Sequence, residues 1–196
     1  MSVGELLEEV KKDALIYSQS HGGVTISGGE PLLNPAFTSE LLQALKEENI
    51  NIGVDTCGYV RWESIQQMLP NIDFFLWDIK HMDPEKHRQL TGVSNELILN
   101  NARLVSERNI PLYIRVPVIP GYNDSEENIG AVGKFSLGLR SVLEVDLLPL
   151  HHLGEGRYRS LDRPYPMAGI PLIPGNTLQA MKRLIESYGL KCEIVA

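Results

Sequence analysis

Residues 21–35 read His21-Gly22-Gly23-Val24-Thr25-Ile26-Ser27-Gly28-Gly29-Glu30-Pro31-Leu32-Leu33-Asn34-Pro35. The β-prone run at 24–26 cannot continue through the glycines and proline of 27–31, so it predicts a short strand that ends in a glycine loop. Asn34 and Pro35 fit the N-cap and first position of a helix. Paired glycines are typical of a tight turn, and they also let a backbone with exposed N–H groups approach a ligand.

The composition predicts one ordinary domain spanning residues 1–196. The chain is 43% hydrophobic and 22% charged, which is enough apolar material for a core. Its net charge of −7 argues against a general nucleic-acid-binding protein. No apolar run approaches the ~18 residues of a membrane span, and the N-terminus lacks a signal pattern, so we expect a cytoplasmic protein without membrane contact.

Strand and helix patterns alternate along the chain. Strands are expected at about 24–26, 51–56, 73–80, 111–120, 142–148 and 191–195, and helices at about 3–19, 35–49, 62–69, from 83, 97–105, from 124, and 176–189. This alternation predicts parallel βα units, arranged as a doubly wound sheet or as part of a βα barrel. The loop at about 151–175 is long enough to be functional.

Several details of these elements are testable. Ser2 and Glu5 fit a capping box, and Asp124 and Asn176 are the expected N-caps of the last two long helices. The nearly continuous apolar run at 73–80 predicts a strand buried on both faces. Strand pairing in 111–120 should end by Pro117, because proline has no N–H to donate.

Polar residues close five successive strand patterns. In α/β folds ligands bind at the carboxyl ends of the strands, so these residues predict a binding site. They are Ser27, Gly28, Gly29 and Glu30, then Asp55 and Thr56, then Asp78 and Lys80, then Arg115, and finally His151.

The predicted site has mixed chemistry. Asp55 and Asp78 suit an ammonium, a ribose or a small cation, although a single aspartate at such a place is often a turn residue. Lys80 and Arg115 suit a carboxylate, and Glu30 is a candidate acceptor for an amine. The set predicts an amino-acid-like ligand.

Other reactive residue types fit structural roles better. Cys57 and Cys192 form no CxxC pattern and are expected to be packing residues, with Cys192 in the core. Trp77 is also expected in the core. The remaining single histidines are expected to be solvated; these are His21, His81 and His87. Of the pair at 151–152, His151 directly closes the apolar run and is expected to face the site.

Five motifs, in this order and spacing, resemble the radical S-adenosylmethionine enzymes that activate glycyl radical enzymes, the pyruvate formate-lyase activating enzyme group. The motifs are Gly22–Pro31, Asp55–Gly58, Trp77–Lys80, Ile114–Gly121 and Leu147–Gly154. The resemblance runs from about residue 3 to the C-terminus and implies a partial parallel βα barrel whose strand ends hold S-adenosylmethionine.

The resemblance also implies residue roles. Ser27, Gly28, Gly29 and Glu30 match the loop at the methionine amino group, and Lys80 matches a residue at the methionine carboxylate. Arg115 and His151 match positions along the ribose and adenine. Asp55, Thr56, Leu76 (through its carbonyl) and Asp78 match a monovalent-cation site of the group.

One family feature is absent from this sequence. The Cys-x3-Cys-x2-Cys motif that binds a 4Fe–4S cluster does not occur, and Cys57 and Cys192 cannot replace three thiolates. The chain therefore resembles the C-terminal part of an activating enzyme whose first strand is missing. We expect it to be inactive alone and to expose the edge of the strand at 24–26, which favours self-association.

The resemblance implies further partners for the intact enzyme. They are a glycyl radical enzyme, from which the adenosyl radical takes a glycine hydrogen, and an electron donor of the flavodoxin or ferredoxin type. Two alternatives stay open. One is a Schiff-base lyase or aldolase that uses Lys80 as nucleophile, and the other is a non-catalytic module for S-adenosylmethionine binding or partner docking.

Overall fold

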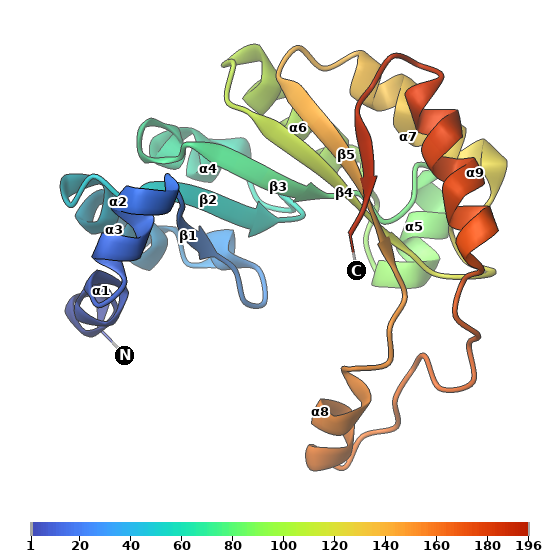
Figure 1. Cartoon of the computed structure of the whole chain (residues 1–196), viewed down its shortest axis with the longest axis horizontal. Helices are drawn as coiled ribbons and strands as arrows, with labels where there is room; N and C mark the ends of the chain where they lie inside the picture. Colours follow the sequence, from blue (N-terminus) through green and yellow to red (C-terminus); the bar gives the residue numbers. More distant parts are fainter. Residues whose placement is uncertain (1, 196) are drawn as a thin grey trace.

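The computed structural model describes residues 2–195 and shows a curved sheet with most of the helices along its outer side (Figure 1). The sheet has six parallel strands in the order in which they follow along the chain. They are β1 (Gly23–Ile26), β2 (Asn51–Thr56), β3 (Phe74–Asp78), β4 (Leu112–Val118), β5 (Val142–Pro149) and β6 (Cys192–Ile194). A doubly wound sheet requires the strand order to reverse at one point, and this order never does. The fold is therefore an open, partial βα barrel with β1 and β6 at its edges.

The helices lie between successive strands, except the first two, which precede β1. They are α1 (Val3–Lys11), α2 (Ala14–Ser20), α3 (Pro35–Glu47), α4 (Trp62–Met68), α5 (Pro84–Thr91), α6 (Glu96–Glu107), α7 (Glu126–Leu137), α8 (Glu155–Ser160) and α9 (Gly175–Glu186). Short 3-10 turns lie at Pro31–Leu33 and Leu69–Asn71. Within the described part of the chain, no helix has the length and apolar character needed to cross a membrane.

The expected helix at 3–19 is two helices. The N–H groups of Lys12 and Asp13 bond to carbonyls three residues back, at Glu9 and Val10, so the α-helical pattern ends there and restarts at Ala14. The capping box of Ser2 and Glu5 is confirmed, and so is the N-cap at Asn34.

Two other expected caps are wrong. Ser125 caps α7 by accepting from the N–H of Asn128, whereas Asp124 turns back to accept from Gly121 at 2.9 Å. The last helix begins at Gly175, so Asn176 lies inside its first turn. A cap is decided by which side chain meets the free N–H groups, and neighbouring Asp, Ser and Asn are equally suited by type.

The two faces of the sheet differ in burial. The outer face lies under the helices and holds fully buried residues such as Phe75 and Trp77, so the expected core position of Trp77 is confirmed. Alternate residues of β3 are only half-buried because the inner face of an open sheet has no covering layer. The expectation that this strand is buried on both faces is therefore wrong.

Pro117 ends strand pairing on one side only. Toward β3 the register stops at Asp78 and Arg115, as expected. Toward β5 it continues to Val118 and Pro149. The missing proline N–H lies on the β3 side, where β3 has already ended, so β4 continues along β5 without losing a bond there.

Between β5 and α9 the chain leaves the sheet and forms an arm (residues 151–172) that carries α8 and projects from the body (Figure 1). The expected long loop is therefore partly helical. None of the α8 residues is buried, and Leu153, Leu161 and Leu172 are exposed.

Candidate functional site

Side chains from the carboxyl ends of β1 and β2 and from the middle of β4 meet at one carboxylate. Asp55 Oδ2 accepts from Ser27 Oγ at 3.3 Å and from the Arg115 guanidinium at 2.8 Å. These partners lie 28 and 60 residues from Asp55 in the sequence. The polar strand ends that the sequence singles out are therefore brought together in space.

Asp78 and Lys80 extend this group at the end of β3. Asp78 pairs in register with Arg115, and its Oδ2 lies 3.9 Å from Lys80 Nζ. Burial raises the pKa of Asp78 to about 6, against the lowering effect of the Lys80 ammonium and with added repulsion from Asp55. The inner face thus presents two carboxylates and two cations side by side.

Glu30 bonds to the loop after β2, and it lines a cavity of about 290 Å³ together with Lys80. One carboxylate oxygen accepts from the Leu32 N–H at 3.2 Å and from the Thr56 hydroxyl. The other accepts from the N–H and thiol of Cys57, at 3.1 and 3.2 Å. Glu30 therefore joins the glycine loop to the end of β2 through contacts within the chain.

Thr56 lies on the other face of β2 from Asp55. It is buried, and its hydroxyl donates to Glu30 and accepts from the Gly58 N–H at 2.8 Å.

In residues 2–195 no three His, Cys, Asp or Glu side chains are grouped so that they could hold a metal ion.

The two cysteines do not form a cluster site. Cys57 is half-buried and its thiol pKa is raised, chiefly by burial. Cys192 is buried, as expected, and burial raises its pKa to about 12. An iron–sulfur cluster needs a set of accessible thiolates, so the described residues do not fit one.

Two histidines expected at the surface are buried. His81 and His87 are only 3% and 2% exposed. His81 Nδ1 accepts from the Asp83 N–H at 2.9 Å, and burial lowers its pKa. His87 Nδ1 lies 2.7 Å from the Val93 carbonyl. Both rings satisfy backbone groups of turns that the helices cover, which explains their burial, whereas His21 is exposed as expected.

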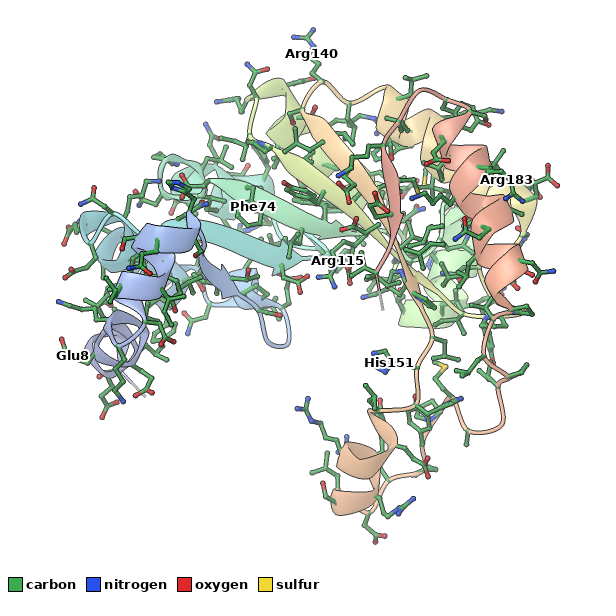
Figure 2. All side chains as sticks on the ribbon, viewed as in Figure 1. Glu8, Phe74, Arg115, Arg140, His151 and Arg183 are labelled. Atoms are coloured by element: carbon green, nitrogen blue, oxygen red, sulfur yellow. The ribbon has the colours of Figure 1, made fainter. Side chains whose placement is uncertain are left out.

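His151 and Arg115 share a cavity of about 410 Å³ at the ends of β4 and β5, which Leu148 also lines. Figure 2 shows Arg115 on the sheet and His151 below it, where the arm begins. The neighbouring His152 is oriented differently: its ring packs on Tyr165 and its Nε2 lies 3.1 Å from the Ile170 carbonyl.

Two kinds of residue near these strand ends are not predicted from the sequence. Asp146 pairs in register with Arg115, is nearly buried, and has its pKa raised to about 6 by burial and by the neighbouring Glu144. The aspartate inside the apolar run at 142–148 is the feature of the sequence that could have indicated a buried carboxylate here. Buried asparagines that hold the strand-end loops were also missed, because asparagine in a loop resembles an ordinary turn residue; they are Asn95, Asn101, Asn123 and Asn128.

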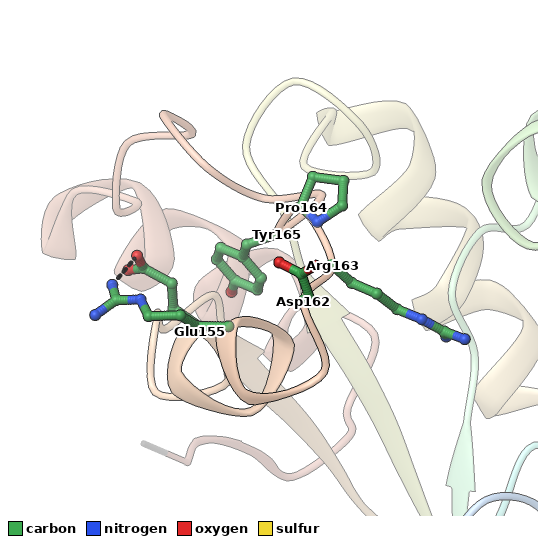
Figure 3. A pocket seen from close by; sticks show the side chains of 6 residues that line it. Glu155, Asp162, Arg163, Pro164 and Tyr165 are labelled. Atoms are coloured by element: carbon green, nitrogen blue, oxygen red, sulfur yellow. Dashed lines mark hydrogen bonds and ion pairs between the residues drawn. The ribbon is translucent and has the colours of Figure 1, made fainter.

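A second cavity, of about 370 Å³, lies in the arm (Figure 3). Its lining includes Tyr165, Arg163 and the ion pair of Glu155 with Arg159, whose charged atoms lie 2.8 Å apart. The arm supplies every lining residue, and α8 is exposed. This cavity is therefore a surface feature of the arm, separate from the strand ends.

Comparison with known proteins decides the family. The model of the radical SAM superfamily matches residues 1–130. The chain belongs to the radical SAM superfamily. A solved domain of pyruvate-formate lyase-activating enzyme from Bacteroides vulgatus is 34% identical, with a TM-score of 0.76 over 89% of this chain and 99% of that domain. A radical SAM methyltransferase from Sphaerobacter thermophilus, 18% identical with a TM-score of 0.73, shares the fold.

The sequence relatives carry the names of activating enzymes. An isethionate sulfite-lyase activating enzyme from Nitratidesulfovibrio vulgaris is 40% identical over 93% of this chain and 58% of its own length. A choline trimethylamine-lyase activating enzyme from Oleidesulfovibrio alaskensis is 36% identical over 99% of this chain and 64% of its own length. The chain thus spans about three fifths of these curated relatives, and its resemblance to activating enzymes of glycyl radical enzymes is confirmed.

Proposed function

We propose that this chain is the S-adenosylmethionine-binding part of a radical SAM enzyme that activates a glycyl radical enzyme. The observation that carries the proposal is the group of two carboxylates and two cations at the strand ends: Asp55 with Arg115, and Asp78 with Lys80. A methionine moiety carries an ammonium and a carboxylate, and such a group offers a partner to each.

Different residues of the chain would bind different parts of the cofactor. Ser27, Gly28 and Gly29 form the loop proposed for the methionine amine, and the φ of +140° at Gly28 is one that only glycine adopts easily. Glu30 supports that loop from behind through its contacts with Thr56 and Cys57. Lys80 is assigned to the methionine carboxylate, and Arg115 and His151 to the ribose and adenine along their shared cavity. When bound, S-adenosylmethionine supplies a sulfonium that one-electron reduction can cleave.

The proposed activity belongs to a protein that also supplies cluster cysteines. Because the described residues do not fit a 4Fe–4S cluster, we assign to them cofactor binding and partner recognition, and we expect no turnover from them alone. The proposed partners are a glycyl radical enzyme, as the names of the relatives suggest, and a flavodoxin- or ferredoxin-type electron donor.

Three smaller proposals accompany this one. The described residues, 2–195, form one partial-barrel domain. A monovalent cation binds at Asp55, Thr56, the Leu76 carbonyl and Asp78; against this, Thr56 directs its hydroxyl to Glu30. Among the described residues β1 pairs with β2 alone, and this edge of the sheet favours self-association.

Titration calorimetry with S-adenosylmethionine tests the main proposal. The chain should bind the cofactor, and Arg115→Ala should weaken binding by about tenfold or more because it removes a charged partner. Arg140→Ala is the matched control, since Arg140 lies in the loop before β5, far from Arg115 (Figure 2), and should leave affinity unchanged. Absence of binding, or equal loss in both variants, would contradict the proposal.

Neither alternative gains support from the comparisons, in which the relatives are radical SAM activating enzymes. Borohydride trapping of a carbonyl compound on Lys80 would reopen the Schiff-base alternative.

A further inference from the structure

Buried asparagine side chains hold the loops that follow β2, β3 and β4. Asn95, Asn101, Asn123 and Asn128 are each no more than 3% exposed. Every one of them donates its side-chain amide to at least one backbone carbonyl of these loops. A buried amide with both donors satisfied fixes the backbone that it contacts.

Asn123 occupies the place where pairing between β3 and β4 stops. The last bond of that ladder runs from the Ile79 N–H to the Arg115 carbonyl, at 2.8 Å. Pro117 has no N–H with which to continue it. Instead, Asn123 Nδ2 donates to the carbonyls of Lys80, at 2.8 Å, and Pro117, at 2.6 Å. The Asn123 side chain thus joins the ends of the two strands where the backbone hydrogen bonds stop.

The same residue is itself held firmly. Asn123 Oδ1 accepts from the Ile119 N–H at 2.8 Å, and its backbone carbonyl accepts from Asn128 Nδ2 at 2.8 Å. Asn128 Oδ1 also accepts from the Met82 N–H at 2.9 Å. Helix α7 is therefore connected through Asn128 and Asn123 to both ends of the turn from Lys80 to Met82.

The Lys80 side chain depends on that backbone for its place. Its Nζ lies 3.9 Å from Asp78 Oδ2, which is beyond hydrogen-bond distance, and the side chain is 41% exposed. A flexible lysine whose ion-pair partner lies beyond hydrogen-bond distance depends on its backbone for its position. Asn123 holds the Lys80 carbonyl and therefore fixes the backbone from which the lysine side chain extends.

We propose that Asn123 is a positioning residue for cofactor binding: it fixes the backbone of Lys80, so that the ammonium meets the carboxylate of the methionine moiety. This inference rests on the proposed function, in which Lys80 binds that carboxylate. Asn128 holds the backbone of Asn123 and so contributes more weakly to the positioning of Lys80.

The chain offers a matched control. Asn101 is equally buried, and its Nδ2 also donates to two backbone carbonyls, those of Gly58 at 2.9 Å and Val60 at 2.8 Å. It holds the loop after β2, which carries no group assigned to the carboxylate. Asn101→Ala and Asn123→Ala therefore remove similar bonds from different loops.

The test compares the affinities of S-adenosylmethionine and decarboxylated S-adenosylmethionine, which lacks only the carboxylate. Asn123→Ala should weaken S-adenosylmethionine binding about fivefold or more while leaving the decarboxylated analogue within about twofold. Lys80→Ala should show the same discrimination, and the double variant should bind no more weakly than Lys80→Ala. Asn101→Ala should affect both ligands equally. Amide exchange at Ile119 verifies that the Asn123 bonds are lost, and Asn128→Ala replaces Asn123→Ala if the latter does not fold.

Equal weakening of both ligands by Asn123→Ala, or additive losses in the double variant, would overturn the inference and leave Asn123 a general structural role. If Lys80→Ala leaves S-adenosylmethionine affinity unchanged, the inference fails while cofactor binding stands. A wild-type chain that binds neither ligand would overturn the proposed function itself, and the inference with it.

Discussion

The strand-end site and the arm are both rich in charged and polar residues, yet they are held in opposite ways. At the strand ends the contacts are long-range: Arg115 reaches Asp55 across 60 positions, and Asn123 reaches Lys80 across 43. In the arm the contacts are local: Glu155 pairs with Arg159, and Tyr165 packs on His152 and Tyr158.

The long-range contacts preorganise the strand-end site, whereas the arm is an exposed segment held by contacts among its own residues. A charged side chain such as Arg115 has its partner on another strand, so its loss leaves a half-buried carboxylate unpaired. A charged side chain in the arm is exposed, and water replaces its partner at little cost. Substitutions of the same residue type should therefore have unequal effects in the two regions.

Glutamate provides the largest expected contrast. Glu30→Ala should lower the free energy of unfolding by about 2–3 kcal/mol, because it leaves the Thr56 hydroxyl and the Cys57 N–H without an acceptor. Glu155→Ala should lower it by no more than about 0.5 kcal/mol, since that ion pair is exposed. Urea unfolding measures both values, and comparable losses in the two variants would remove the distinction between the regions.

Aspartate gives a contrast in pH dependence. The pKa of Asp78 is raised from 3.8 to about 6 in the fold, so the folded state binds the proton more tightly than the unfolded state. This group therefore costs stability as the pH rises from about 4 to 6, and the cost is complete above pH 6. Asp146, with its pKa also raised to about 6, acts in the same direction.

Asp78→Asn should consequently raise the free energy of unfolding by roughly 1–2 kcal/mol at pH 8 and have little effect near pH 4. Asp162→Asn, at an exposed position in the arm, is the control and should change neither value. Unfolding curves at several pH values provide the measurement. A gain for Asp78→Asn that is the same at pH 4 and pH 8 would show that ionisation is not its cause.

The smallest expected effect lies within the arm. Tyr165→Ala removes ring contacts with His152 and Tyr158, at centroid distances of 5.8 and 5.4 Å, and should change global stability by less than about 1 kcal/mol. It should nevertheless speed tryptic cleavage after Arg157 and Arg159, because the arm loses its internal packing. Tyr165→Phe keeps the ring and should cleave at the wild-type rate. Unchanged cleavage in Tyr165→Ala would mean that other contacts hold the arm.

Much of the fold follows from signals within a few residues of one another. The caps at Ser2, Asn34 and Asp83 were predictable because each side chain meets an N–H two or three residues away. Where several capping residues adjoin, as at Asp124 and Ser125, type alone does not select the cap. The gathering of polar strand ends was also predictable, because parallel strands place their carboxyl ends at one edge of the sheet.

The sequence by itself determined the alternation of strands and helices, the glycine loop, and the residues that line the strand ends. The tertiary structure decided where those side chains point. It turned Glu30 to Cys57, buried His81 and His87, and placed Asn123 beside Lys80. The physical reason is that these contacts join residues far apart in sequence: each buried polar group takes whatever partner the packed fold brings to it, and no local pattern records that choice.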